Sequence, residues 1–283
     1  MEQASRLLNP NILAALSAVL MLSSAAMAIE RSVTVPLKLA GNYPIFEADI
    51  DGHTIPLMFD LGEDSALVLT RAALEELKIT PVNSGHAVSD VKGNTMESPK
   101  FTVRSLKIGG ASFSDVSGRI DIHDPSYQSA HVGQLGYVGP LLVHDYRIVL
   151  DYRHGQMTLI PPRIHDAARA GCRGIVVPFL PEWDGAPVTK AHTDLGDLTV
   201  VWDTGAPISI LRRAVAEQAH PNFSGQFLTT QHFRLKDTNF GPLELRVIDF
   251  SQPPGSDGFI GTNFFVHHVV CVDLPANRFL IHN

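Results

Sequence analysis

The sequence predicts an all-β protein made of two similar lobes with short helices, and three observations support this. Glycine (22) and proline (19) are plentiful among the 283 residues, and many short apolar runs lie between turn signals. A hydrophobic content of 45% over this length is enough for one large domain or two medium ones. Two sequence patterns also occur once in each half, in the same order, which indicates a duplicated lobe.

The first repeated pattern is an apolar pair between two glycines. Residues 136–139 (Gly-Tyr-Val-Gly) align without a gap to residues 258–261 (Gly-Phe-Ile-Gly), at an offset of 122 residues. In each half an apolar strand follows and ends in an aspartate, Asp151 or Asp273, which we interpret as a turn residue. Because this offset is far longer than a solenoid repeat, the repeated unit is a whole lobe.

The second repeated pattern is an apolar strand that stops at Asp-x-Gly, followed by a short helical pattern. It covers residues 55–62, which end in Asp-Leu-Gly, and residues 198–205, which end in Asp-Thr-Gly. The N-terminal lobe is therefore assigned to residues 29–165 and the C-terminal lobe to residues 172–283, with a proline-containing connection before the second lobe.

The N-terminus is typical of a secretory signal peptide at residues 1–28. Arg6 lies in a short polar start, an apolar stretch covers residues 12–22, and small residues end at Ala28. This arrangement predicts cleavage after Ala28 and export to a periplasm or to the exterior. The alternative is an uncleaved anchor. The apolar stretch is short for a membrane-spanning helix of about 20 residues, and we expect no membrane association after cleavage.

Charge and residue usage argue against several classes of function. The net charge is -7 and no run of Lys and Arg occurs, which argues against a nucleic-acid partner. The 13 histidines show no metal-binding spacing, and neither cysteine lies in a zinc or nucleophile motif. Cys172 and Cys271 can pair in an oxidising compartment, but the sequence leaves open whether they come close enough.

The most specific signal is Asp203-Thr204-Gly205-Ala206, which follows an apolar strand. The strand carries the aspartate into the interior, and the glycine permits a tight turn whose N–H can reach a carboxylate. The threonine hydroxyl can donate and accept a hydrogen bond at once. Asp-Thr-Gly alone is a weak signal because many loops contain it, but here a downstream Phe-Ile-Gly accompanies it.

With these motifs in both halves, the chain resembles the aspartic peptidases of the pepsin and retropepsin group, and its short lobes resemble the bacterial retropepsin-like proteins. The resemblance implies the bilobal acid-protease fold, with two β-barrel-like lobes related by a pseudo-twofold axis. It also implies a monomer that acts on a peptide or protein and needs no cofactor or metal. The implied catalytic pair is Asp60 and Asp203, and the implied supporting residues are Gly62, Thr204, Gly205 and Ala206.

The chemistry that the resemblance implies is peptide-bond hydrolysis by an aspartic endopeptidase. Two adjacent carboxylates cannot both ionise easily, so they share one proton. The ionised member then acts as general base on a water, and the protonated member polarises the substrate carbonyl. We expect such a site to work best in mild acid.

The first motif departs from the family pattern. Leu61 stands where the family has a threonine that locks the two loops together by crossed hydrogen bonds, so we expect a looser or altered contact between the loops. Glu63 and Asp64 add negative charge, which should raise the cost of ionising Asp60. The alternative hypothesis is therefore a degenerate relative that binds peptide or protein without cleaving it.

Two further features have both a functional and an ordinary structural interpretation. The segment 84–97 is typical of a hairpin, which is either a flap over the site or an ordinary surface hairpin. Phe59 and Trp202 precede the two aspartates, and we interpret them as core side chains facing away from the carboxylates.

Overall fold

The computed structural model describes residues 31–89, 92–122, 133–180, 185–251 and 253–283. The predicted signal peptide at residues 1–28 lies outside the described residues and stays a prediction. The chain from Arg31 to Asn283 forms one unit, built mainly from β-strands with a few short helices, so the all-β prediction is confirmed. Among the described residues, no helix combines the length and apolar character needed to cross a bilayer.

The first half forms a sheet with the strand order β2-β3-β4-β9-β5-β8-β7-β6. Its strands are β2 (Lys38–Ala40), β3 (Tyr43–Ile50), β4 (His53–Phe59), β5 (Leu67–Leu69), β6 (Val82–Ser89), β7 (Thr95–Ile108), β8 (Ala111–Ile120) and β9 (Gly136–Val138). The helix α1 (Arg71–Glu76) follows β5, and the Thr70 side chain accepts a hydrogen bond from the Ala73 N–H at its start.

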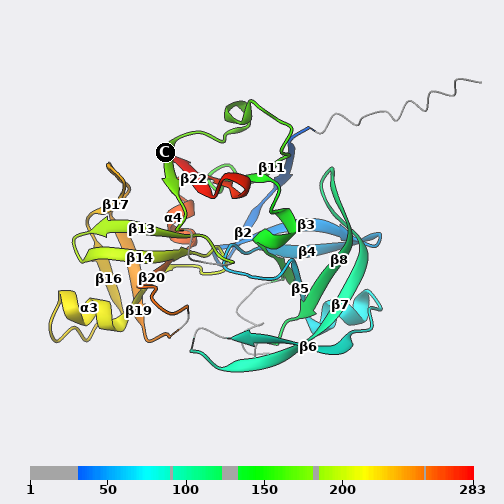
Figure 1. Cartoon of the computed structure of the whole chain (residues 1–283), viewed down its shortest axis with the longest axis horizontal. Helices are drawn as coiled ribbons and strands as arrows, with labels where there is room; N and C mark the ends of the chain where they lie inside the picture. The colour runs from blue at the N-terminus through cyan, green and yellow to red at the C-terminus, as the bar shows by residue number, and fades with distance from the viewer. Residues whose placement is uncertain (1–30, 90–91, 123–132, 181–184, 252) are drawn as a thin grey trace, which may run out of the picture. The chain divides into compact units, whose positions relative to one another are not determined.

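The second half forms a corresponding sheet with the strand order β16-β19-β15-β20-β14-β13-β17-β18. Its strands are β13 (Val188–Thr193), β14 (Gly196–Trp202), β15 (Ser209–Arg212), β16 (Phe227–Thr230), β17 (Phe233–Leu235), β18 (Thr238–Asn239), β19 (Leu243–Ile248) and β20 (Gly258–Ile260). The helices α3 (Arg213–Ala219) and α4 (Thr262–Phe265) follow β15 and β20. Figure 1 shows the two halves on either side of a third sheet, to which each half contributes strands.

The two halves pair their central strands in the same way, which confirms the repeat. β4 runs parallel to β9 with Phe59 opposite Val138, and β14 runs parallel to β20 with Trp202 opposite Ile260. β9 is also antiparallel to β5, as β20 is to β15. Each Asp-x-Gly turn therefore leaves a strand whose neighbour carries the apolar-apolar-Gly block.

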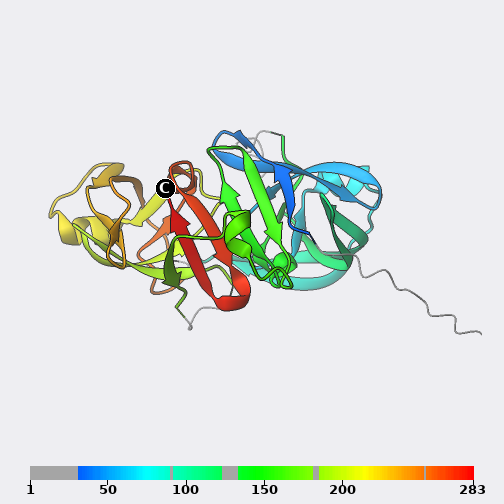
Figure 2. The ribbon, with the colours of Figure 1, turned by 90° about the horizontal axis from the view of Figure 1, so that it is seen from above.

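A third sheet takes strands from both halves, in the order β1-β11-β10-β21-β22-β12. Its strands are β1 (Val33–Pro36), β10 (Arg147–Asp151), β11 (Gln156–Ile160), β12 (Ile175–Pro178), β21 (Val269–Asp273) and β22 (Arg278–His282). β10 and β21 meet in antiparallel register, with Val149 opposite Cys271. Figure 2 shows β10 and β11, in green, beside β21 and β22, in red.

One large cluster of buried apolar side chains extends through both halves. Phe59 and Trp202 belong to it and are fully buried, which confirms that they are core residues. The Trp202 ring packs against Phe264, Phe265 and Phe279. Because these phenylalanines lie in α4 and in β22 of the third sheet, the residue before Asp203 ties its strand to the centre of the molecule.

A disulfide joins Cys172 to Cys271, with their Cα atoms 5.0 Å apart, so the pairing that the sequence left open is formed. Cys172 follows the short 3-10 helix η3 (Ala167–Ala170) in the connection between the halves. Cys271 lies in β21. The bridge therefore fixes the connection to the third sheet.

Candidate active site

The two aspartates stand at equivalent positions, one residue beyond β4 and one residue beyond β14. The Asp60 N–H donates to the Val138 carbonyl at 3.0 Å, and the Asp203 N–H donates to the Ile260 carbonyl at 3.0 Å. Each aspartate is thereby held by the last residue of the strand beside its own. The repeated blocks in the sequence therefore build the same support twice.

Each aspartate is also held by its own loop. The Gly62 N–H donates to Asp60 Oδ1 at 2.8 Å, and the Gly205 N–H donates to Asp203 Oδ1 at 2.8 Å. The Ala206 N–H adds a bond of 3.2 Å to the same oxygen of Asp203. These bonds favour the ionised carboxylates and fix their orientation.

The glycines of the two loops show how closely the carboxyl groups approach each other. A Cβ added at Gly62 would lie 2.8 Å from the Asp203 Cγ, and one added at Gly205 would lie 2.5 Å from the Asp60 Oδ2. Each glycine therefore makes room for the carboxyl group of the opposite half. Asp60 and Asp203, which are 143 residues apart in the sequence, are brought together in one site.

The electrostatics of the pair follow from this contact. Burial, and next the charge of Asp203, raise the pKa of Asp60 well above its usual range. Burial also raises the pKa of Asp203, while the hydrogen bond from Asp60 acts in the opposite direction. Such a coupled pair binds one proton over a wide pH range, and the proton belongs to the pair.

The two loops are connected by a hydrogen-bond lock that is complete on one side. The buried Thr204 hydroxyl accepts from the Leu61 N–H at 2.9 Å and donates to the Phe59 carbonyl at 2.6 Å. Leu61 is fully buried but has no hydroxyl to return these bonds. The substitution therefore alters the contact between the loops, as expected from the sequence, and one threonine supplies both bonds across the halves.

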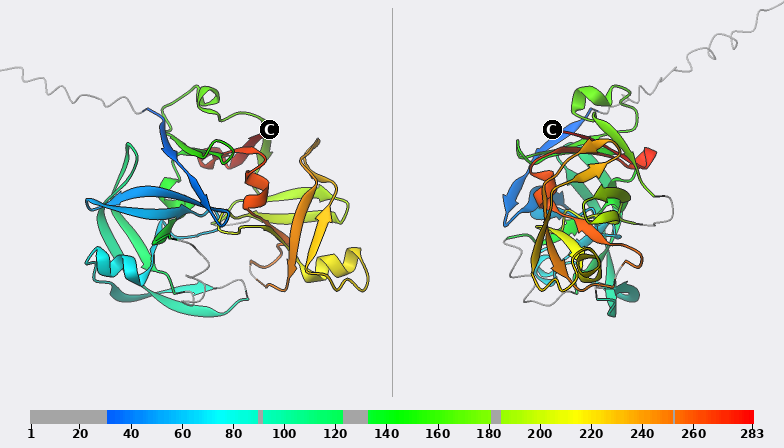
Figure 3. Two further views of the ribbon diagram at one scale, coloured as in Figure 1. Left: turned by 180° about the vertical axis from the view of Figure 1, so that it is seen from behind. Right: turned by 90° about the vertical axis from the view of Figure 1, so that its left-hand side faces the viewer.

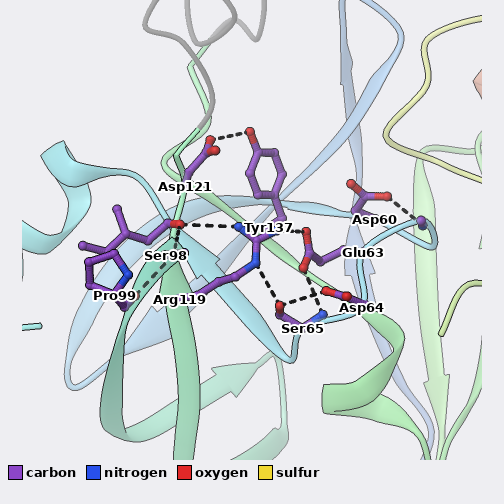
Figure 4. Close-up of polar contacts among 11 residues, drawn as sticks. Asp60, Glu63, Asp64, Ser65, Ser98, Pro99, Arg119, Asp121 and Tyr137 are labelled. Carbon is purple, nitrogen blue, oxygen red and sulfur yellow. Dashed lines mark hydrogen bonds and ion pairs between the residues drawn. The ribbon is translucent and has the colours of Figure 1, made fainter. Parts of the chain in front are cut away.

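The charge of Glu63 is compensated by a residue that sequence reasoning missed. Arg119 in β8 is buried and donates from Nη2 to Glu63 Oε2 at 2.7 Å. Its Nε donates to the Ser65 hydroxyl at 3.0 Å, and the Ser65 N–H donates to Glu63 Oε1 at 2.9 Å. Figure 4 shows this network beside Asp60. An arginine inside an alternating strand gives no sequence signal of such a role.

Three tyrosines surround the aspartate pair and were also missed. Tyr43 starts β3, whose pairing with β4 places Ile45 opposite Met58, two residues before Asp60. Burial raises the pKa of Tyr43, Tyr137 and Tyr152, and the charge of Asp60 contributes at each of them. The Tyr137 hydroxyl donates to Asp121 at 2.8 Å (Figure 4). If β3 and β4 are assumed to pair across the turn at residues 51–52, the sequence predicts that Tyr43 lies at the same end of the hairpin as Asp60.

Other residues singled out in the sequence have structural contacts. The Asp151 carboxylate accepts from the His154 N–H at 3.1 Å, as expected for a turn residue. Asp273 is buried and forms ion pairs with Arg147 and Arg278, which the sequence did not indicate. Within the described part of the chain, no group of three or more metal-ligating side chains comes together.

The predicted hairpin at residues 84–97 is present as the antiparallel pair β6 and β7, with Val88 opposite Met96. It lies on the side of the first half away from the third sheet (Figure 3). Both views of Figure 3 agree on this placement. Whether this hairpin closes over a bound ligand stays a prediction.

Comparison with known proteins adds one finding. Residues 46–137 match the family model described as aspartyl protease, which supports an aspartic peptidase of the retropepsin type. The match includes the whole Asp60 loop, Arg119 and the first two residues of β9, and covers about a third of the chain. The search of the curated proteins found no match. The Asp203 loop lies outside the matched residues and is related to the first loop by the internal repeat.

Proposed function

Because residues 46–137 match the family model described as aspartyl protease, we propose that this protein is an aspartic endopeptidase that hydrolyses peptide bonds. The catalytic residues in this proposal are Asp60 and Asp203. The supporting residues are Gly62, Thr204, Gly205 and Ala206. No cofactor takes part in the chemistry that we propose.

The single observation that carries the proposal is the contact between the two carboxyl groups across the two Asp-x-Gly loops. An isolated buried aspartate has no chemical advantage, whereas a pair that shares one proton holds a base and an acid side by side. The glycine N–H groups of both loops hold this pair in place. A decayed binding site has no chemical need for this arrangement.

In the proposed mechanism the two carboxyl groups divide the work. Asp203 takes a proton from a water molecule that attacks the peptide carbonyl carbon. Asp60 donates its proton to the carbonyl oxygen, and a tetrahedral diol forms. Asp203 then gives its proton to the leaving nitrogen while Asp60 takes one back from a diol hydroxyl, so that the C–N bond breaks, the product carboxyl group forms and the pair again holds one proton. The raised pKa of Asp60 keeps this acid protonated above the usual range of a carboxyl group.

The first prediction tests this mechanism with Asp203→Asn, which keeps the side-chain shape and removes the base. We expect the wild type to cleave members of a peptide library in mild acid, and the variant to be slower by a factor of about 100 or more. Mass spectrometry of the products measures both. Asp237→Asn, a substitution at an exposed site, is the matched control and should cleave like the wild type.

The binding hypothesis remains the second candidate because Leu61 leaves the loop lock one-sided. Under it, the wild type would be as inactive as Asp203→Asn across the library and would still bind peptides in a calorimetric titration. This result would contradict the endopeptidase proposal. Cleavage that disappears only in Asp203→Asn would exclude the binding hypothesis.

We also propose that the protein works after export, in a periplasm or outside the cell, as a monomer acting on a peptide or protein. The N-terminal sequence pattern supports export. The Cys172–Cys271 disulfide adds support, since such bridges persist in oxidising compartments.

A further inference from the structure

The strongest unexplained feature near the site is a buried ion pair between Glu63, which stands where the family pattern has a small or polar residue, and Arg119. Glu63 is the residue after the Asp60-Leu61-Gly62 turn, and its side chain is 10% exposed. The Arg119 side chain that contacts it is 5% exposed. Taking two charges out of water is costly, and their mutual attraction offsets the cost only with good geometry and further hydrogen bonds. This pair has both.

The pair holds the first loop from three directions. Arg119 contacts Glu63 through Nη2 and Ser65 through Nε, while Glu63 accepts from the Ser65 N–H through its second oxygen. The third nitrogen of the Arg119 guanidinium, Nη1, lies 3.4 Å from the carbonyl oxygen of Ile120, the next residue in β8. The segment that follows Asp60 is thereby fixed to β8, a strand that the rest of the loop does not pair with.

In the second half, the contacts that follow the Asp-x-Gly loop are made by uncharged groups. The Ser209 N–H and hydroxyl both donate to Asn263 Oδ1 at 2.7 Å, and the Gly261 N–H donates to the Ser209 hydroxyl at 3.0 Å. The strand after the Asp203 loop is thus held at its start by uncharged groups. The ion pair in the first half adds something that the neutral network lacks, namely a pair of opposite charges beside the carboxyl groups.

We propose that Glu63 and Arg119 are positioning residues that hold the Asp60 loop, where Leu61 cannot, and keep the net charge beside the two carboxyl groups near zero. This proposal rests on the proposed function. It makes Glu63 part of the working site, whereas the sequence suggested a disturbance of it. The pair acts through Asp60 and Asp203 and does not itself need to contact substrate.

Several charged and titratable groups share this region. Asp203 feels the charge of Glu63, and Glu63 feels the charges of Arg119, Asp60 and Asp64. Arg119 carries the opposite charge 2.7 Å from Glu63. The groups on neighbouring elements that face the aspartates or the pair are Tyr43, Tyr137, Tyr152, Asp121 and, opposite Arg119 in β7, Lys100.

The test is a charge cycle on the pair. Glu63→Gln leaves an unpaired cation and should move the titration of Asp60 and Asp203 to lower pH by about 1 unit. Arg119→Met removes the cation. Glu63 is then either an unpaired anion, which raises the pKa of the aspartates, or a neutral acid, so the titration should not move to lower pH. Combining the two substitutions makes the pair neutral and should bring the titration back toward the wild-type position, which loss of packing alone would not do.

Two measurements follow the titration. The first is the alkaline limb of the pH–rate profile for peptide cleavage. The second is the carbon-13 chemical shift of the aspartate carboxyl groups against pH, which needs no activity. Lys100→Gln is the matched control, because it removes an exposed cation opposite Arg119 that has no contact with Glu63 in the described structure. It should leave the titration in place.

Each outcome decides something. A Glu63→Gln shift to lower pH that the double variant reverses supports the proposal. No shift in Glu63→Gln, or an equal shift in all three variants, overturns it. A wild type that cleaves nothing while the carboxyl titration still shifts and reverses would contradict the endopeptidase function and leave the role of the ion pair standing.

Discussion

At the residue scale, the proton shared by Asp60 and Asp203 links the site to the stability of the fold. Burial and the charge of Asp203 raise the pKa of Asp60 above the unfolded value of about 3.9. Between these two pKa values the folded state binds more protons than the unfolded state, so stability falls as pH rises. The ionised pair is therefore a cost to folding at neutral pH.

Asp60→Asn should remove this cost. We expect the variant to be more stable than the wild type at pH 7.5, by a few degrees in Tm, and the difference to shrink toward zero near pH 3. Thermal unfolding between pH 3 and 8 measures it, with Asp237→Asn as the surface control. A wild type that gains stability relative to the variant as pH rises would show that Asp60 is ionised in the fold, contrary to the shared-proton arrangement.

At the scale of elements, the two Asp-x-Gly turns depend on each other through Thr204. Thr204→Val keeps the shape of the side chain and leaves the Leu61 N–H and the Phe59 carbonyl without their partner. Burying such groups unpaired should cost about 2 kcal/mol or more of unfolding free energy. Chemical denaturation measures this cost, and Thr229→Val on the exposed face of β16 should change stability by less than about 0.5 kcal/mol. Equal stability of the two variants would show that the lock contributes nothing.

At the scale of elements, the sequence predicts the strands that carry the aspartates, but it does not predict all the residues around them. The Asp-x-Gly strands and the apolar-apolar-Gly blocks are local patterns, and both appear as β4, β14, β9 and β20 in the expected order. The aspartate pair follows because equivalent elements in two copies meet across a pseudo-twofold axis. Arg119 could not be predicted, since its partner Glu63 is 56 residues away and a buried cation in a strand has no periodic signal. The compensation of Glu63 therefore appears only in three dimensions.

At the scale of the whole molecule, the third sheet makes the two halves a single structure. In this sheet β10 of the first half pairs with β21 of the second half. Each half also supplies one edge strand, β1 from the first half and β12 from the second. The site needs this sheet, because Trp202, next to Asp203, packs on Phe279 of β22. Any loss of order in the third sheet should therefore reach the carboxyl pair.

The disulfide acts at this scale, because Cys172 and Cys271 are 99 positions apart in the sequence and enclose most of the second half. In the chain-entropy account, closing a loop of about 100 residues stabilises the fold by about 4 to 5 kcal/mol. We expect Cys172→Ala/Cys271→Ala to lower Tm by about 10 °C, and a reductant to lower the Tm of the wild type to that of the variant. The variant itself should be insensitive to reductant. A wild type with two titratable thiols after reduction and an unchanged Tm would show that the third sheet holds the halves together without the bridge.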